Sequence, residues 1–369
     1  MAEATTPVPP LTQSRMGSTL QTKKMLSSYL SSEFLLPGMQ TLFSSETSYR
    51  TNIFGFPGVS NSLANFGLMD QRLAIEWIRD NIASFGGDPS RITLFGQSAG
   101  AGSIDLYSYA YLSDPIISGM ILQSGTTGLG VYQPEDTAAG WYNVTSTLGC
   151  GDNSTSSDML LACMRSKSQE EITKAIPTSN SPFGAAAFWP TIDERLVFSN
   201  YTNRSSVSIP LLIGTTNYEA GYHKVMSSLF DASELPDEQW DGFNNMIFNC
   251  PAAKRAAESV EQGRPTWRYR YFGKFSDMSL TTDGRDGGAY HGSELAVLFG
   301  TTGGGEDESV GRYMRGAWAA FAKDSVKGLR KYGGGWPKYQ PGEKTMARLA
   351  VNNKAGIDLV EPEVYDSSC

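Results

Sequence analysis

The stretch ITLFGQSAGAGS, residues 92–103, decides how the rest of the chain is interpreted. Four residues that favour β-structure lead into Gly96-Gln97-Ser98-Ala99-Gly100, and small residues compatible with a helix follow. One interpretation is a tight turn without chemistry. The other is a sharp strand-to-helix turn that presents the Ser98 hydroxyl as a nucleophile. Because this pentapeptide arises by chance in many sequences, the choice depends on the partners that a nucleophilic serine needs.

The flanking sequence predicts an α/β domain. Apolar residues recur at helical spacing over residues 68–85, and a Gly-Gly pair ends this helix. The apolar positions of this helix are Ile75, Ile78, Ile82 and Phe85. Short apolar or alternating runs predict strands over 92–95, 119–125, 209–214 and 266–273. Further helices are expected over 101–112, 234–248, 251–262 and 308–323. Strands alternating with helices favour a mostly parallel sheet covered on both faces.

Composition excludes several classes of function. The 369 residues carry a net charge of −8 without a basic run, which argues against nucleic-acid binding. No stretch of 18 or more apolar residues predicts a membrane span. Two histidines and four cysteines lack the spacing of a metal site, and the glycine-rich stretches 300–307 and 332–336 are interpreted as loops rather than phosphate cradles. We therefore expect no metal and no cofactor.

A serine hydroxyl needs a neighbouring base, and histidine is the usual one. His291 lies in a glycine-rich loop after the predicted strand 266–273, where the working groups of open α/β sheets collect. His223 follows Glu219 by four residues and is expected on an exposed helix face. His291 is therefore the preferred base.

The third member of such a relay orients the imidazole and stabilises its positive charge. Glu219 follows the buried run 209–214, and Asp193 and Asp286 are the alternatives. With Glu219 the order is nucleophile, acid, base, which is the order of α/β-hydrolases.

At this point the chain resembles the type B carboxylesterase/lipase family, which includes the cholinesterases. The resemblance rests on YRTNIFGFPG, on NFGLMDQRLAIEWIRDNIASFGGDPSRITLFGQSAGAGS, on MILQSG and on GAYHGSELAVLFG, and it covers roughly residues 49–366. It implies an α/β-hydrolase fold with a central, mostly parallel sheet. It also implies a serine hydrolase that cleaves small-molecule or lipid carboxylic esters. Ser98 would be the nucleophile, Glu219 the acid and His291 the base.

The resemblance extends to supporting residues. Ala99 would supply a backbone N–H to the oxyanion hole, and Ser124 would support the site through hydrogen bonds. Gln97 stands where many members have Glu. The family's small disulfide loop corresponds to Cys150 and Cys163, while Cys250 and Cys369 have no assigned partners.

Two features depart from the family pattern. Residues 1–60 contain no histidine and no Gly-Gly pair, so the upstream glycine-rich oxyanion loop is missing, as are the early strands. We expect an unmatched polar tail over 1–45 and an esterase domain over 46–369. An apparent N-terminal truncation of this kind would impair catalysis.

The indications about the cellular compartment conflict. The first 30 residues lack the apolar block of a signal peptide. Four Asn-x-Ser/Thr sequons, expected in surface loops, and the short cysteine loop favour an extracellular glycoprotein. These sequons begin at Asn143, Asn153, Asn200 and Asn203.

Two other functions are compatible with parts of this sequence. One is a non-catalytic, cholinesterase-like protein that acts through its surface, although such proteins typically lose the nucleophile that Ser98 represents. The other is a serine carboxypeptidase, which Glu219 and the context of His291 argue against. Phe188, Trp189 and Tyr290 either line a substrate pocket or pack in the core.

Overall fold

The computed structural model describes residues 27–29, 42–58, 64–129, 134–177, 188–229, 235–281, 287–300, 305 and 307–369. Its centre is a six-stranded sheet in which the strand order follows the chain, from β3 to β8. The strands β3 to β7 are parallel, and β8 pairs antiparallel with β7. The strands are β3 (Thr93–Gln97), β4 (Gly119–Gln123), β5 (Leu211–Thr216), β6 (Thr266–Tyr271), β7 (Met346–Leu349) and β8 (Ile357–Val360). Separately, β1 (Ser27–Tyr29) pairs antiparallel with β2 (Ser44–Glu46).

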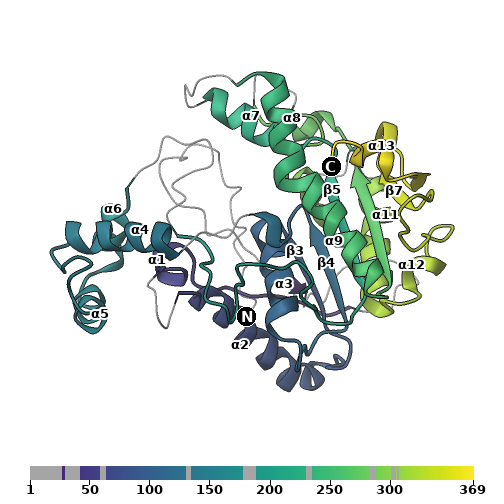
Figure 1. Cartoon of the computed structure of the whole chain (residues 1–369). Helices are drawn as coiled ribbons and strands as arrows, with labels where there is room; N and C mark the ends of the chain where they lie inside the picture. The colour runs from purple at the N-terminus through teal and green to yellow at the C-terminus, as the bar shows by residue number, and fades with distance from the viewer. Residues whose placement is uncertain are drawn as a thin grey trace, which may run out of the picture.

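Helices pack on both faces of this sheet (Figure 1). On one face lie α2 (Phe66–Asn81), α3 (Ala99–Ala110) and α9 (Cys250–Glu261). On the other lie α10 (Ser293–Phe299), α11 (Glu308–Lys323) and α12 (Gly328–Lys331). The described residues thus confirm the predicted α/β class, a mostly parallel sheet between helical layers.

A second group of helices stands to one side of the sheet (Figure 1). It has an apolar cluster of its own and consists of α1 (Asn52–Gly55), α4 (Pro134–Thr147), α5 (Ser157–Arg165) and α6 (Gln169–Ala175). Beyond one end of the sheet lie α7 (Ala220–Leu229) and α8 (Asp237–Asn244), followed by the π-helical turn η3 (Asn245–Asn249). The short elements are α13 (Glu363–Asp366) and the 3₁₀ turns η1 (Ile82–Phe85), η2 (Thr127–Leu129), η4 (Ser276–Met278) and η5 (Val351–Asn353).

The predicted helix over 68–85 is correct except at its end. Ile75, Ile78 and Ile82 are buried against the sheet, whereas Phe85 is 54% exposed. The α-helix ends at Asn81 and a tighter 3₁₀ turn follows, so the periodicity that would bury Phe85 is lost.

Strand β6 shows why alternation alone does not predict an exposed face. Its aromatic residues Trp267, Tyr269 and Tyr271 pack in the cluster that contains α11. The alternating Arg268 and Arg270 are also buried, because each guanidinium has hydrogen-bond partners on the opposite face.

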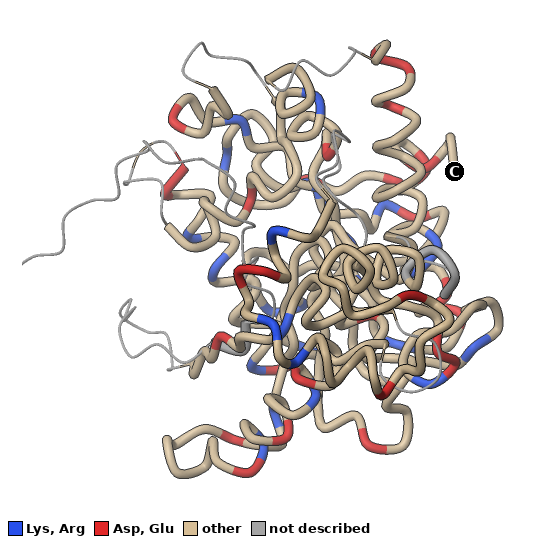
Figure 2. The backbone as a smooth tube through the Cα atoms, turned by 90° about the vertical axis from the view of Figure 1, so that its left-hand side faces the viewer, with Lys and Arg blue, Asp and Glu red and all other residues tan. Residues whose placement is uncertain are grey.

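Acidic and basic residues are interspersed along the described backbone (Figure 2). Within this part of the chain, no helix combines the length and apolar character that a membrane crossing requires.

Candidate active site

Ser98 occupies a strained turn between β3 and α3. Its backbone φ of +58° and ψ of −129° lie outside the regions that most residues adopt. Glycines allow the close packing around it: a Cβ on Gly96 would lie 2.6 Å from the carbonyl carbon of Gly100, and one on Gly125 would lie 2.1 Å from the Ser98 carbonyl oxygen. Strain held by surrounding structure is typical of a nucleophile elbow.

The carboxyl ends of neighbouring strands bring the candidate residues to one edge of the sheet. Ser98 follows β3 and Ser124 follows β4, and backbone hydrogen bonds join Ser98 N–H to Gln123 O and Ser124 N–H to Gly214 O. Past β5, the Tyr218 N–H donates to Ala289 O over 3.0 Å. This last bond ties the loop that carries Glu219 to the loop that carries His291.

Three side chains meet at this edge. The Nε2 of His291 lies 2.8 Å from the Ser98 Oγ, and its Nδ1 lies 2.6 Å from the Glu219 Oε2. The Glu219 side chain is fully buried and that of His291 is 9% exposed. A carboxylate next to Nδ1 favours the tautomer with the proton on Nδ1, which leaves the Nε2 lone pair facing the serine hydroxyl. This arrangement allows transfer of a proton from Ser98 to His291.

Glu219 is held in place through its second oxygen. Its Oε1 accepts hydrogen bonds from the Ser124 hydroxyl and from the Thr216 N–H, both over 2.6 Å. Ser124 itself is buried and has a positive φ of 52°. These contacts hold the carboxylate toward the imidazole.

Two further residues border the Ser98 hydroxyl. Ala99 is the first residue of α3, and N–H groups in the first turn of a helix have no acceptor within that helix. The Nε2 of Gln97 lies 3.2 Å from the His291 Nε2, so the amide and the serine hydroxyl approach the same ring nitrogen. A glutamine there adds no charge to the site.

The sequence also offered Asp193 and Asp286 as acids in place of Glu219. Asp193 organises its own loop, because its Oδ1 accepts three backbone N–H groups, those of Arg195, Leu196 and Val197. Asp286 lies outside the described residues.

His223 differs from the sequence-based expectation. It is half-buried rather than exposed, and its ring centroid lies 5.8 Å from that of His291. Helix α7 turns His223 inward because this side of the helix faces the aromatic residues Phe243 and Phe248.

The three aromatic residues suggested for a substrate pocket lie in different environments. Phe188 is buried in the apolar cluster of the side helices, and Trp189 is half-buried. The Tyr290 hydroxyl donates to the Met278 carbonyl oxygen over 3.1 Å. For Phe188, the interpretation as a core residue is the one that the structure supports.

Sequence reasoning missed a buried carboxyl behind the relay. Glu294 is 1% exposed, and its Oε1 accepts from the Gln123 amide over 2.8 Å. The Gln123 oxygen in turn accepts from the Trp318 indole N–H. Burial, and secondarily the nearby Glu219, raises the pKa of Glu294 to about 8. The local sequence offers no signal for this, because an acidic residue in the first turn of a helix is ordinarily a solvated one.

All four cysteines are paired. The disulfide Cys150–Cys163, which the resemblance implied, joins the turn after α4 to α5. A second, Cys250–Cys369, joins residues 119 apart in sequence, and the even cysteine count was its sole signal. Of the four sequon asparagines, all are exposed, but Asn143 lies on helix α4 rather than in the predicted loop.

Comparison with known proteins gives consistent matches. A model described as the carboxylesterase family matches residues 45–241 and 229–365. Secreted lipase 5 of Gibberella zeae is 36% identical over 340 residues, which cover 84% of this chain and 62% of that protein. Chlorogenic acid esterase of Aspergillus niger is 34% identical over 348 residues, 87% of this chain and 65% of that protein. Carboxylesterase 5A of Felis catus is 27% identical over 377 residues, 86% of this chain and 67% of that protein. The chain thus spans less than two thirds of the length of the first two relatives.

Proposed function

This chain belongs to the carboxylesterase family, and we propose that it hydrolyses carboxylic esters through an acyl-enzyme intermediate on Ser98. The observation that carries the proposal is the hydrogen-bonded series from Ser98 through His291 to Glu219. Relatives named as a lipase and as esterases agree with ester substrates.

In the first half-reaction, the Ser98 Oγ attacks the ester carbonyl carbon while its proton passes to the His291 Nε2. Glu219 stabilises the imidazolium that forms, since its carboxylate lies 2.6 Å from Nδ1. The imidazolium then gives the proton to the leaving alcohol as the acyl–oxygen bond of the ester breaks. In the second half-reaction, His291 takes a proton from the water that attacks the acyl group. The imidazolium then returns this proton to the Ser98 Oγ as the bond between the acyl group and Ser98 breaks.

The oxyanion formed in each step needs hydrogen-bond donors. We assign the Ala99 N–H as one donor, because it begins α3 beside the nucleophile. Residues 1–60 lack the family's glycine-rich loop motif. Loss of a single donor costs about 3 to 4 kcal/mol of transition-state stabilisation, which corresponds to about 10²–10³-fold in turnover.

We also propose that the protein acts outside the cell. Two disulfides are stable in oxidising compartments, and one relative is named a secreted lipase. The four exposed sequon asparagines would then carry glycans. Protein made in a secreting eukaryotic host should lose mass on treatment with an N-glycosidase, and an unchanged mass would contradict glycosylation.

The nucleophile is tested with a short-chain p-nitrophenyl ester and a fluorophosphonate probe. Wild-type protein should hydrolyse the ester and be labelled at Ser98, and Ser98→Ala should abolish labelling and lower kcat/KM by at least about 10³-fold. Ser118→Ala is the matched control, because Ser118 lies before the opposite end of β4. Hydrolysis that survives Ser98→Ala would overturn the assignment. Absence of both labelling and hydrolysis in the wild type would favour the non-catalytic alternative.

A further inference from the structure

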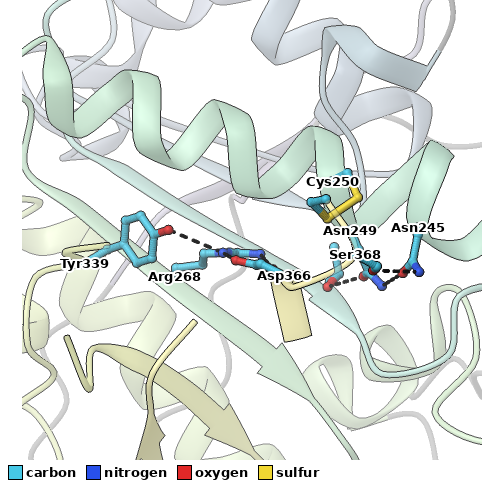
Figure 3. Close-up of a disulfide and its surroundings, with 9 residues drawn as sticks. Asn245, Asn249, Cys250, Arg268, Tyr339, Asp366 and Ser368 are labelled. Carbon is cyan, nitrogen blue, oxygen red and sulfur yellow. Dashed lines mark hydrogen bonds and ion pairs between the residues drawn. A yellow bond between two sulfur atoms is a disulfide. The ribbon is translucent and has the colours of Figure 1, made fainter. Parts of the chain in front are cut away.

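Strand β6 carries two buried arginines on one face, Arg268 and Arg270, and their charges are balanced differently. The Arg268 guanidinium pairs with the carboxylate of Asp366, with Nη2 2.8 Å from Oδ1, and its Nη1 donates to the Tyr339 hydroxyl over 3.4 Å (Figure 3). For Arg270, no carboxylate of the described residues lies within ion-pair distance, and its Nη1 has no hydrogen-bond partner among them. The positive charge of Arg270 therefore acts on more distant groups.

Arg270 contacts the short segment that carries Glu219. Its Nε donates to the Asn217 Oδ1 over 3.1 Å, and its Nη2 donates to the Asn217 backbone oxygen over 2.9 Å. The Asn217 N–H donates to the Tyr271 backbone oxygen over 2.8 Å. The face of the guanidinium lies 4.5 Å from the centroid of the Tyr365 ring, which fixes it from another side. Asn217, two residues before Glu219, is thus tied to β6 by three hydrogen bonds.

The buried Glu219 carboxylate needs a compensating charge. Its contacts in the described part of the chain are the Ser124 hydroxyl, the Thr216 N–H and the imidazole of His291, and none of them is a cation while His291 is neutral. A buried carboxylate is costly unless a positive charge compensates it. Burial lowers the pKa of Arg270, and among the neighbouring charges the Glu219 carboxylate opposes that change most strongly. Because a guanidinium keeps its proton, Arg270 supplies a fixed positive charge near Glu219.

We propose that Arg270 is a positioning residue for Glu219: it fixes the Glu219 segment through Asn217, and its charge favours the form in which Glu219 is a carboxylate and His291 is neutral. This inference rests on the proposed esterase function. The active form of the Glu219–His291 pair carries one negative charge, and the form with one more proton carries none. A nearby cation stabilises the active form, on whichever residue the extra proton would lie. Arg270 therefore extends the activity toward lower pH.

Other titratable groups surround this pair, and they are the same in the wild type and in Arg270 variants. His223 lies beside His291, Glu294 and Tyr269 lie near Glu219, and Arg268, Asp366 and Tyr365 lie near Arg270. A difference between two pH profiles therefore isolates the contribution of the guanidinium.

The first test is the pH profile of kcat/KM for p-nitrophenyl acetate. Arg270→Met should move the acidic limb of the profile upward by about one pH unit, the scale for one charge near a buried pair. It should also lower the plateau of kcat/KM about tenfold, mostly through kcat, because contacts to Asn217 are lost and none to the substrate. Arg270→Lys keeps the charge without the two-pronged contact, so its plateau should fall while its acidic limb stays in place. A purely structural role would lower both plateaus and leave both limbs unmoved, and that result would overturn the proposal.

The matched control is the double variant Arg268→Met/Asp366→Asn. It removes a buried ion pair from the same face of β6, and the pair as a whole carries no net charge. Its melting temperature should fall while the acidic limb keeps its wild-type position. A limb that moves as far in this control as in Arg270→Met would overturn the assignment to Arg270. Should Arg270→Met fail to fold, Arg270→Gln also removes the charge but keeps an amide donor, and the same shift of the limb is expected.

A second measurement does not depend on hydrolysis. The chain has two histidines, so the imidazole resonances of His291 can be assigned by comparison with a His223→Gln variant and followed by NMR as the pH changes. The midpoint of the His291 titration should move upward by about one pH unit in Arg270→Met and stay in place in Arg270→Lys. If the wild type shows no labelling and no hydrolysis, the esterase proposal fails while this titration still tests Arg270. An unchanged midpoint in Arg270→Met would refute the electrostatic role.

Discussion

Glu294 offers the sharpest test of the electrostatics behind the candidate site. The carboxyl is buried, its Oε1 accepts a hydrogen bond from the Gln123 amide, and its Oε2 has no hydrogen-bond partner among the described residues. A charged carboxylate in this place is shielded from bulk solvent and pairs with no cation in the described part of the chain, so the folded protein favours the neutral acid. Glu294→Gln keeps the shape and the acceptor for Gln123 and removes the ionisation.

The direction and size of the effect follow from the pKa. Folding raises the pKa of Glu294 from 4.5 to about 8, chiefly through burial. At a pH between these two pKa values, Glu294 is protonated in the folded protein but has lost its proton in the unfolded chain. The stability of the wild type therefore falls as pH rises through this window. Relative to Glu294→Gln, we expect a loss of about 3 to 4 kcal/mol in the free energy of unfolding between pH 5 and pH 8, at about 1.4 kcal/mol per pKa unit.

Urea denaturation of both proteins at several pH values measures this difference, and groups common to both cancel. The variant should gain on the wild type steadily from pH 5 to pH 8. Parallel stability curves across this range would refute the inference that Glu294 is neutral in the folded protein. A growing advantage of the wild type would indicate that the buried group is stabilised as a carboxylate.

Two further predictions concern single contacts. Ser124→Ala removes a hydrogen bond to the buried Glu219 and should lower kcat/KM for an ester about tenfold, since hydrogen bonds to charged groups contribute about 1.5–3 kcal/mol. Ser118→Ala, at the other end of β4, is the control. An equal loss of kcat/KM in that variant would contradict the role assigned to Ser124. Asp105→Ala removes the carboxylate that forms an ion pair with the buried Arg255, and it should lower the free energy of unfolding by about 3 to 5 kcal/mol. Urea denaturation measures this change. A loss below about 1 kcal/mol would show that the ion pair is dispensable for stability.

Local sequence patterns predicted much of the fold. The apolar spacing of 68–85 and the short runs before Ser98, Ser124 and Glu219 predicted elements that the structure has. Residues that follow the parallel strands of one sheet lie at the same sheet edge, so the sequence alone could pair Ser98 with Glu219. The side helices α4 to α6 were not predicted, and their apolar residues pack in a cluster that also contains Leu68 of α2 and Leu106 of α3.

Local patterns determined the strand-to-helix turn at Ser98 and the strand ends, because neighbouring residues impose them through backbone geometry. Tertiary structure alone decided the Cys250–Cys369 bond, the burial of Glu294 and the inward turn of His223. Each of these depends on which surfaces pack together over separations of tens to more than a hundred residues. Such packing depends on how entire helices and strands fit against one another, so a short stretch of sequence cannot predict it.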